Sequence, residues 1–211
     1  MPRCLIFANG TLPNLDSARR LIHADDFILC ADGGTRHALT LGLTPRLIIG
    51  DLDSATLDLE SLTSKDAQVI QFPRDKNETD LELALEYAVA QNYREIVILA
   101  ALGNRLDQTL GNIALLSDPR YSEFDIRIDD GIEQAFFCRA ESDITGMPGD
   151  LISILPWGGA VTGVRTAGLK WTLNAETLLP HKTRGISNEM LGEVAQVKIT
   201  SGLLLIIHRR K

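Results

Sequence analysis

Residues 47–54 read Leu-Ile-Ile-Gly-Asp-Leu-Asp-Ser, an apolar run that stops at a glycine before two aspartates. The run Leu47–Ile49 is short and lies between a proline and a glycine, which predicts a buried strand. Acidic residues directly after a parallel strand lie where open α/β sheets bind their ligands. Asp51 and Asp53 carry the hard oxygen ligands that Mg²⁺ takes together with phosphate oxygens. The stretch therefore indicates an α/β sheet with a metal site, although Asp53 or Ser54 could instead cap a helix.

The same pattern continues on both sides of this stretch, because short apolar runs alternate with helical patterns from the N-terminus to about residue 130. Such alternation predicts a parallel sheet covered by helices. The expected strands are Cys4–Ala8, Phe27–Ala31, Leu47–Ile49, Val69–Phe72, Ile96–Ala100 and Phe124–Ile128. The expected helices lie near Leu15–His23, Thr35–Leu41, Leu57–Ser64, Asp80–Gln91 and Asp107–Leu116.

The helix expected at Asp80–Gln91 has the clearest signals. Apolar residues recur there with helical spacing and form one face, namely Leu81, Ala84, Leu85, Ala88 and Val89. Thr79, followed three residues later by Glu82, is a capping box that predicts the start of the helix. Asp80 then lies in the first turn, near the positive end of the helix dipole.

The pattern changes after Gly131, where helical periodicity gives way to short β-prone runs separated by glycines and prolines. Several short strands between turn signals favour a small antiparallel sandwich or barrel. We therefore place a domain boundary near residue 130 and expect an α/β domain over 1–130 and an all-β domain over 131–211. The expected strands are Ala135–Cys138, Leu151–Leu155, Val161–Val164, Val194–Ile199 and Leu203–Ile207.

Composition narrows the classes of function. The formal net charge of −7 argues against a nucleic-acid partner, since binding phosphate backbones requires a basic surface. No apolar run approaches the ~18 residues that predict a membrane-spanning helix, so we expect no membrane partner. Cys4, Cys30 and Cys138 are widely spaced and odd in number, which favours reduced thiols and a cytoplasmic location.

Charged side chains and glycines follow several of the expected strands, where each strand connects to a helix. All these connections emerge at the same edge of a parallel sheet, where glycine lets the backbone approach a ligand and helix N-termini attract anions. Each aspartate could simply cap its helix, but acids mixed with bases suit a divalent cation and a phosphoryl group. The residues that this edge would collect are Asp32, Asp51, Asp53, Asp75, Asp80 and Asp107, with Lys76 and Arg105.

The order of these motifs resembles the thiamine pyrophosphokinase family over nearly the whole chain. In the first domain the resemblance rests on Ala31-Asp32-Gly33-Gly34, Gly50-Asp51-Leu52-Asp53-Ser54, Lys76-Asn77-Glu78-Thr79-Asp80 and Arg105-Leu106-Asp107-Gln108. In the second domain it rests on Gly168-Leu169-Lys170-Trp171 and Gly185-Ile186-Ser187-Asn188-Glu189. Three positions differ from many relatives, because Asn77 replaces an aspartate, Asn104 a glycine and Gln108 a histidine.

The resemblance implies a Rossmann-like N-terminal domain, a C-terminal β-sandwich, and a homodimer with its sites at the subunit interface. It implies an ATP:thiamine diphosphotransferase that yields thiamine diphosphate and AMP with Mg²⁺. Asp51, Asp53 and Asp80 would hold the metal, and Arg105 and Asp107 would lie against it and the polyphosphate. The residues implied for ATP and its phosphates are Asp32, Gly33, Asp75, Lys76, Thr79 and Gln108, and those for thiamine are Trp171, Ser187 and Asn188.

Several alternatives remain open from the sequence. The general base could be Asp107 or Asp75, and the sequence does not choose between them. A pterin pyrophosphokinase would turn over a hydroxymethylpterin, and a glycosyltransferase with an Asp-x-Asp motif would use a nucleotide sugar. A non-catalytic ATP-Mg²⁺ sensor would bind the nucleotide without releasing AMP.

Overall fold

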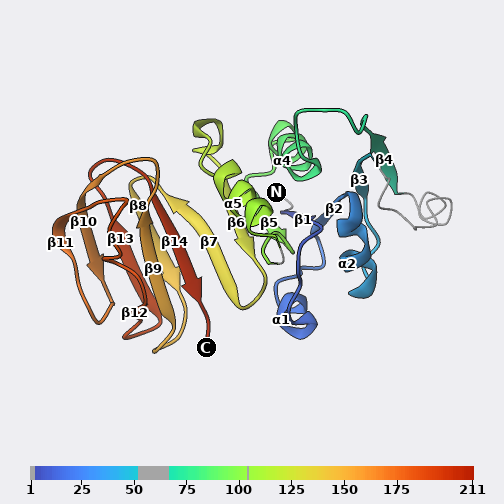
Figure 1. The fold of residues 1–211 in the computed structure, drawn as a ribbon. Coiled ribbons are helices and arrows are strands. Elements are labelled where there is room, and N and C mark those ends of the chain that lie inside the picture. The colour runs from blue at the N-terminus through green and yellow to red at the C-terminus, as the bar shows by residue number, and fades with distance from the viewer. Residues whose placement is uncertain (1–2, 52–66, 104) are drawn as a thin grey trace. The chain divides into compact units, whose positions relative to one another are not determined.

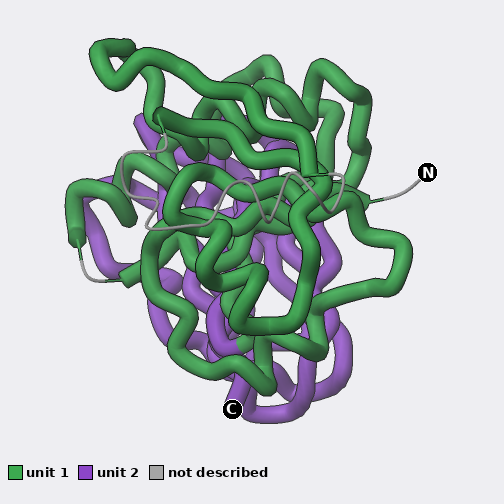
Figure 2. Tube along the Cα trace, turned by 90° about the vertical axis from the view of Figure 1, so that its right-hand side faces the viewer, with its two compact units in different colours: residues 1–131 green, residues 132–211 purple. Residues whose placement is uncertain are grey.

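The computed structural model describes residues 3–51, 67–103 and 105–211, and all structural statements concern these residues. The chain forms two compact units, Met1–Gly131 and Ile132–Lys211, which are coloured separately in Figure 2. Unit 1 is mixed α/β and unit 2 is built from antiparallel strands (Figure 1). Among the described residues, no helix is long and apolar enough to cross a membrane.

Unit 1 contains a parallel sheet in the order β6-β5-β1-β2-β3-β4. The strands are β1 (Cys4–Phe7), β2 (Phe27–Ala31), β3 (Leu47–Gly50), β4 (Gln68–Gln71), β5 (Glu95–Leu99) and β6 (Asp125–Asp129). The helices are α1 (Leu15–Arg19), α2 (Thr35–Thr40), α4 (Asp80–Ala90) and α5 (Leu106–Leu115), with 3₁₀ turns η1 (Asp32–Gly34) and η2 (Pro119–Tyr121). These elements confirm the predicted parallel sheet with its helices.

The order of the strands explains where a ligand can bind. Chain order runs one way from β1 to β4, and β5 and β6 lie on the other side of β1, so the order reverses between β1 and β5. Every residue of β1 and β3 is buried, which fits continuous apolar runs in a sheet covered on both faces. Such a reversal leaves a crevice at the carboxyl ends of the strands.

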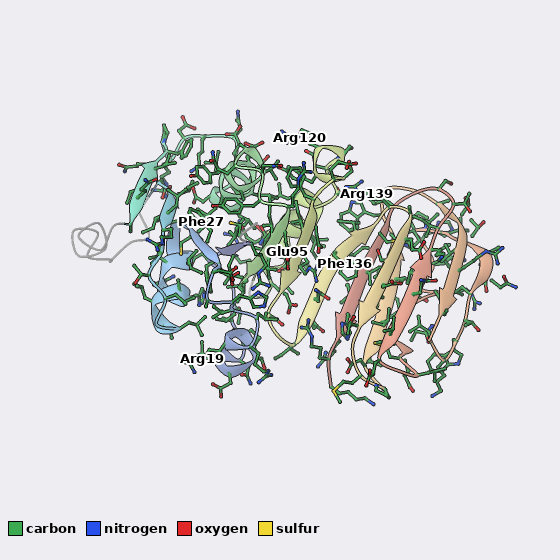
Figure 3. All side chains as sticks on the ribbon, turned by 180° about the vertical axis from the view of Figure 1, so that it is seen from behind. Arg19, Phe27, Glu95, Arg120, Phe136 and Arg139 are labelled. Carbon is green, nitrogen blue, oxygen red and sulfur yellow. The ribbon has the colours of Figure 1, made fainter. Side chains whose placement is uncertain are left out.

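The opposite, amino-terminal edge of this sheet is closed by side chains. Phe27, which is labelled in Figure 3, begins β2. It stacks on Tyr93 with the ring centroids 5.2 Å apart. Arg3 forms an ion pair with Asp26, with Nη2 and Oδ2 2.8 Å apart, and its Nη1 lies 3.6 Å from Glu95 Oε1 at the start of β5. These contacts hold the starts of the strands together.

Helix α4 begins and packs as its sequence predicts. Thr79 is the N-cap, and its Oγ1 accepts a hydrogen bond of 3.1 Å from the Glu82 backbone N–H. The predicted apolar face is buried except that Val89 is only partly covered. The cap fixes the first turn of the helix and thereby the position of Asp80.

Unit 2 contains two antiparallel sheets, with the orders β12-β9-β14-β7 and β11-β10-β13-β8. Buried residues from both sheets form one apolar cluster, which includes Cys138, Ile144, Ile154 and Val197. The strands are β7 (Glu133–Cys138), β8 (Glu141–Thr145), β9 (Leu151–Pro156), β10 (Val161–Ala167), β11 (Asn174–Leu178), β12 (Asn188–Glu189), β13 (Val194–Lys198) and β14 (Leu204–Arg209).

The structure corrects several element boundaries. Helix α1 ends at Arg19 instead of His23, because the chain turns at residues 20–21. Strands β8, β11 and β12 were not predicted, and each lies at the edge of its sheet with few buried side chains. The helix expected at Leu57–Ser64 lies outside the described residues.

Candidate functional site

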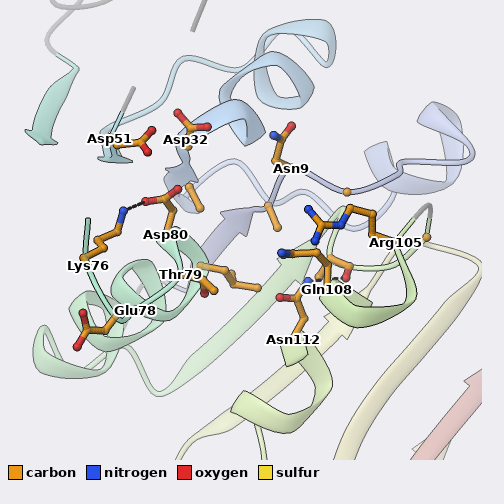
Figure 4. Close-up of a pocket in the computed structure, with 16 residues that line it drawn as sticks. Asn9, Asp32, Asp51, Lys76, Glu78, Thr79, Asp80, Arg105, Gln108 and Asn112 are labelled. Carbon is orange, nitrogen blue, oxygen red and sulfur yellow. Dashed lines mark hydrogen bonds and ion pairs between the residues drawn. The ribbon is translucent and has the colours of Figure 1, made fainter. Parts of the chain in front are cut away.

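A cavity of about 540 Å³ opens at the carboxyl edge of the unit 1 sheet. Loops after β1, β2, β3, β4 and β5 line it, together with the starts of α4 and α5 (Figure 4). The polar residues that line it are Asn9, Asp32, Asp51, Lys76, Glu78, Thr79, Asp80, Arg105, Gln108 and Asn112. The crevice expected from the strand order is therefore present and strongly polar.

Three carboxylates meet on one side of this cavity. Asp32 follows β2, Asp51 follows β3 and Asp80 begins α4, and each offers an oxygen within 4.8 Å of the others. Asp32 is buried, and its Oδ1 has no hydrogen-bond partner among the described residues. A buried carboxylate oxygen without a partner is costly unless a cation or donor satisfies it. The donor set fits a hard divalent cation such as Mg²⁺.

The local backbone explains how Asp32 reaches this position. Asp32 has φ +42°, a left-handed conformation that few non-glycine residues adopt. Thr35 stabilises it, because its Oγ1 donates to Asp32 O at 2.8 Å. On the neighbouring strand, a Cβ added to Gly50 would lie 2.8 Å from Asp32 Cβ. Gly50 is thus needed for the close approach of Asp32 to β3.

Asp80 is paired with a base from the preceding loop. Lys76 Nζ lies 2.9 Å from Asp80 Oδ1, as Figure 4 shows. Burial raises the pKa of Asp80 above its usual value, and the charges of Asp32 and Asp51 add to the rise. The hydrogen bond and charge of Lys76 act in the opposite direction. Lys76 therefore offsets part of the repulsion among the three acids.

The other side of the cavity carries Arg105 and residues of α5. Arg105 forms an ion pair with Asp107, with Nε and Oδ1 3.2 Å apart, and both side chains are largely exposed. The hydrogen bond from Arg105 lowers the pKa of Asp107. One turn farther along the helix from Gln108, Asn112 donates from Nδ2 to Ala101 O at 2.7 Å and is buried. This wall offers a cation and amide groups to a ligand.

The structure brings most, but not all, of the predicted site residues together. Asp75 and Asp107 are exposed and do not line the cavity, and Gly33 lies beside it without lining it. Asp53 falls outside the described residues, so its predicted metal role stays a prediction. The predicted residues that do line the cavity are Asp32, Asp51, Lys76, Thr79, Asp80, Arg105 and Gln108.

Sequence reasoning missed Asn9, Glu78 and Asn112. Asn9 lies two residues after the end of β1, in the loop that follows this strand, so the position rule used for the other strands could have found it. Glu78 lies inside the motif before α4, between residues that were assigned. Asn112 had no such signal, because an asparagine inside a helix is commonly exposed.

Unit 2 has a separate cavity of about 400 Å³, and it contains two of the three residues predicted for thiamine. Trp171 lines it and is 55% exposed, an unusual position for so large a ring. Buried Asn188 accepts from Trp171 N at 3.0 Å and donates to Trp171 O at 2.7 Å, which fixes the tryptophan backbone. Lys170 Nζ lies 4.8 Å from the ring centroid, so the indole already faces a cation.

The third predicted residue, Ser187, does not line this cavity. It has φ +58°, and its backbone N–H donates to Ser153 Oγ at 3.0 Å. Ser187 instead shapes the turn that brings Ile186 and Asn188 to the cavity wall. Its predicted contact with thiamine stays a prediction.

A parallel α/β sheet with acids and bases gathered at its carboxyl edge is typical of enzymes that act on phosphorylated substrates. Comparisons with known proteins are more specific. The family profile "Thiamin pyrophosphokinase, catalytic domain" matches residues 18–141, and "Thiamin pyrophosphokinase, vitamin B1 binding domain" matches residues 140–204. The chain belongs to the thiamin pyrophosphokinase family.

Individual relatives agree with this assignment. A thiamine pyrophosphokinase of Bacillus subtilis is 31% identical over 179 residues, which cover 83% of this chain and 84% of the relative. The crystal structure of thiamine pyrophosphokinase from Bacillus subtilis superposes with a TM-score of 0.89 at 26% identity and covers 99% of both chains. That of thiamin pyrophosphokinase from Geobacillus thermodenitrificans has a TM-score of 0.83 at 26% identity and covers 100% of this chain and 98% of its own.

Proposed function

We propose that this chain transfers the pyrophosphoryl group of ATP to the hydroxyl of thiamine, forming thiamine diphosphate and AMP. Membership of the thiamin pyrophosphokinase family supports this activity. The observation that carries it is the cavity of unit 1, where Asp32, Asp51 and Asp80 meet opposite Arg105. Neither a pterin pyrophosphokinase nor a non-catalytic ATP-Mg²⁺ sensor gains support from the relatives.

The domain assignment belongs to the same proposal. Residues 1–130 are a Rossmann-like domain that binds ATP and Mg²⁺, and residues 131–211 are a β-sandwich that binds thiamine. The units at Met1–Gly131 and Ile132–Lys211 support the boundary, and the shared core of the two sheets of unit 2 supports a sandwich. The vitamin B1 binding profile, over residues 140–204, supports the division of roles.

Within unit 1 the described residues divide into those for a metal and those for phosphates. Asp32, Asp51 and Asp80 would hold Mg²⁺, which supplies positive charge to the polyphosphate when bound. Asp53 would join them by family resemblance. Lys76 screens charge beside Asp80, and Arg105 presents its guanidinium from the opposite wall. Positioning and charge neutralisation of this kind account for most of the catalysis of phosphoryl transfer.

The reaction forms a bond from the thiamine hydroxyl oxygen to the β-phosphorus of ATP. The bond from the β-phosphorus to the oxygen that bridges the α- and β-phosphates breaks, AMP leaves, and the hydroxyl proton is released. The ion pair with Arg105 lowers the pKa of Asp107, which weakens this candidate as a proton acceptor. Asp75 lies in the loop before α4, close in sequence to Lys76.

Thiamine would bind in the cavity of unit 2. Its thiazolium ring is a permanent cation, and a tryptophan face binds cations well. Trp171 offers an exposed face there, beside buried Asn188.

We also propose a homodimer with its sites at the subunit interface, supported by the exposed Leu106 and Leu110 one turn apart on α5. Three buried free cysteines fit the expected cytoplasmic location.

Product analysis tests the proposed function. The purified chain is incubated with thiamine, ATP and Mg²⁺, and the products are identified by mass, with a chelator in the control. We expect AMP and thiamine diphosphate, and neither in the control. ADP with thiamine monophosphate would contradict transfer of a pyrophosphoryl group.

A further inference from the structure

The loop after β1 reaches the cavity of unit 1 and is held by helix α2. Asn9 and Gly10 line the cavity. Arg36 Nη2 donates to Asn9 Oδ1 at 2.9 Å, and the next residue, His37, places Nε2 3.0 Å from Gly10 O. Two consecutive side chains of one helix thus fix two consecutive residues of the cavity wall.

The backbone of this loop is fixed as well. Ala8 N donates to Leu99 O at 2.9 Å, at the carboxyl end of β5. Gly10 N donates to Ala100 O at 2.7 Å and Thr11 N to Leu102 O at 2.9 Å. The loop therefore stays in place whatever side chain residue 9 carries.

The orientation of the Asn9 amide follows from its partner. A guanidinium has donors and no acceptor, so the atom that faces Arg36 is the carbonyl oxygen and the NH₂ group faces elsewhere. The amide also lies against Gly33, where an added Cβ would come within 2.5 Å of Asn9 Cγ, Oδ1 and Nδ2. Arg36 itself does not line the cavity. Asn9 is thus held in one orientation with its donor group available.

We propose that Asn9 donates a hydrogen bond from Nδ2 to a phosphate oxygen of ATP, and that Arg36 and Gly33 are positioning residues that act through Asn9. The proposal rests on the proposed function, since it takes ATP as the ligand of unit 1. Figure 4 shows Asn9 between Asp32 and Arg105, so a polyphosphate that reached from the acids to the arginine would pass it. Hydrogen bonds to charged acceptors are among the strongest in proteins.

Two substitutions of Asn9 test the donor. Asn9→Ala removes it, and Asn9→Asp keeps the shape and the acceptor for Arg36 but replaces the NH₂ with a charged oxygen. We expect the ATP Kd of the full chain with Mg²⁺, measured by calorimetry, to rise about ten- to a hundredfold for Asn9→Ala. Asn9→Asp should weaken ATP binding further because it repels phosphate, and the thiamine KM should stay unchanged. An unchanged ATP Kd, or a raised thiamine KM instead, overturns the proposal.

A double-mutant cycle tests the positioning role of Arg36. If Arg36 acts through Asn9, Arg36→Ala weakens ATP binding in the parent and has no further effect in the Asn9→Ala background. Losses that add in the double variant would mean that Arg36 binds ATP directly, which contradicts the positioning role. Arg19→Ala is the matched control, because Arg19 is an exposed arginine of α1 paired with Asp16 outside the cavity.

Gly33 gives a second cycle. Gly33→Ala should weaken ATP binding, because its methyl group displaces the amide, and the effect should disappear once Asn9 is alanine. An equal effect in both backgrounds contradicts the role of Gly33. Failure of the proposed function can be told apart from failure of this proposal. If the chain binds ATP but makes no thiamine diphosphate, the proposed function is wrong, and the ATP Kd values of the variants still decide the role of Asn9. A chain that binds no ATP overturns both.

Discussion

At the scale of single residues, the described lining of the unit 1 cavity carries four acidic and two basic side chains. Asp32, Asp51 and Asp80 lie within 4.8 Å of one another, with Lys76 paired to Asp80. Carboxylates so close together repel, which is consistent with the raised pKa of Asp80. Removing one of these charges should therefore affect the function far more than the fold.

We expect Asp32→Asn to lower turnover at least about 10²-fold, the scale for loss of one preorganised electrostatic group. The free energy of unfolding without ligands should change by less than about 1 kcal/mol, since the lost charge had been repelled by its neighbours. Steady-state kinetics and urea unfolding measure the two effects. Asp16→Asn, an exposed acid of α1, is the control and should match the parent. Near-normal turnover of Asp32→Asn at saturating Mg²⁺ would contradict the metal site.

Trp171 allows a second test at this scale. Trp171→Ala should raise the thiamine KM about three- to thirtyfold, because a cation–π contact contributes about 0.5–2 kcal/mol. The ATP KM should stay nearly unchanged, and Trp171→Phe should recover part of the loss. Trp157 is the matched control, since its ring packs edge-on against Phe137, 5.5 Å away, and does not line the cavity. Equal loss of both substrates would indicate that Trp171 only packs.

The sequence predicts charged site residues better than neutral ones. Asp32, Asp51 and Asp80 stand directly after strands or at a helix start, where position and charge both indicate a ligand. Asn9 has the position but no charge, and Asn112 has neither. The direction of the side chain also matters, because Asp107 belongs to the motif and pairs with the cavity residue Arg105, yet does not itself line the cavity.

At the scale of elements, helix α4 links stability to the site. Its cap, Thr79, lines the cavity, and the next residue is Asp80. The first turn of the helix therefore has to form for the carboxylate to meet Asp32. Loss of the cap should loosen this turn first, since helix ends fray when their N–H groups lack partners.

Thr79→Ala should lower the free energy of unfolding by about 1 kcal/mol through loss of the cap. Turnover should fall by more than this destabilisation explains, because Asp80 loses its fixed position. Urea unfolding and kinetics on the same preparation compare the two, with Thr79→Ser as the variant that keeps the cap. A variant that unfolds more easily but turns over normally would show that Thr79 acts as a cap alone.

Strands and helices were predictable from the sequence where apolar residues form a continuous run or one continuous helix face. The strands β1, β2 and β3 and the helix α4 fall in this group, and their predicted ranges agree to within a residue. Strand β8 reads Glu-Ser-Asp-Ile-Thr and buries Ile144 alone, so its pairing with β13 creates the strand rather than its own pattern. Strand β11 likewise depends on β10.

At the scale of the whole molecule, the chain forms two compact units, Met1–Gly131 and Ile132–Lys211. The domain boundary that the change of pattern after Gly131 indicated stays a prediction. The order of the strands within unit 1 could not be read from the chain, because β1 lies between β2 and β5 through contacts distant in sequence. That order is what brings the loop after β1 into the same cavity as the loops after β2 and β3.

Resistance of the folded chain to acid should depend on a buried pair in unit 2. His208 Nε2 lies 2.9 Å from Asp150 Oδ2, and both side chains are nearly inaccessible. Burial alone would raise the pKa of Asp150, but hydrogen bonds from His208 and from the backbone of Lys211 and Met147 outweigh it and lower the pKa. A lowered pKa in the folded state means stability that is complete above the unfolded value of about 3.9 and is lost as the pH falls through the folded value.

We therefore expect Asp150→Asn to lower the free energy of unfolding at pH 7 by about 1–3 kcal/mol. The difference from the parent should shrink as the pH falls below about 4, where the parent loses the same charge. Urea unfolding across this range measures it. Asp143→Asn, an exposed acid of β8 bonded to Gln196, is the control and should have a much smaller effect. A constant difference at all pH values would show that charge is not the cause.

The contact between Gly50 and Asp32 has a consequence for how this chain can evolve. Gly50 lies in the extended backbone of β3, where alanine would ordinarily be accepted, and the obstacle is the Cβ of Asp32. A larger residue at position 50 meets the Cβ of any side chain at position 32, so this clash is relieved only if residue 32 becomes glycine, and that step removes a carboxylate of the cavity. Selection on the acid at position 32 therefore constrains position 50 indirectly. Both positions should therefore stay unchanged together among descendants of this sequence, although 18 positions separate them.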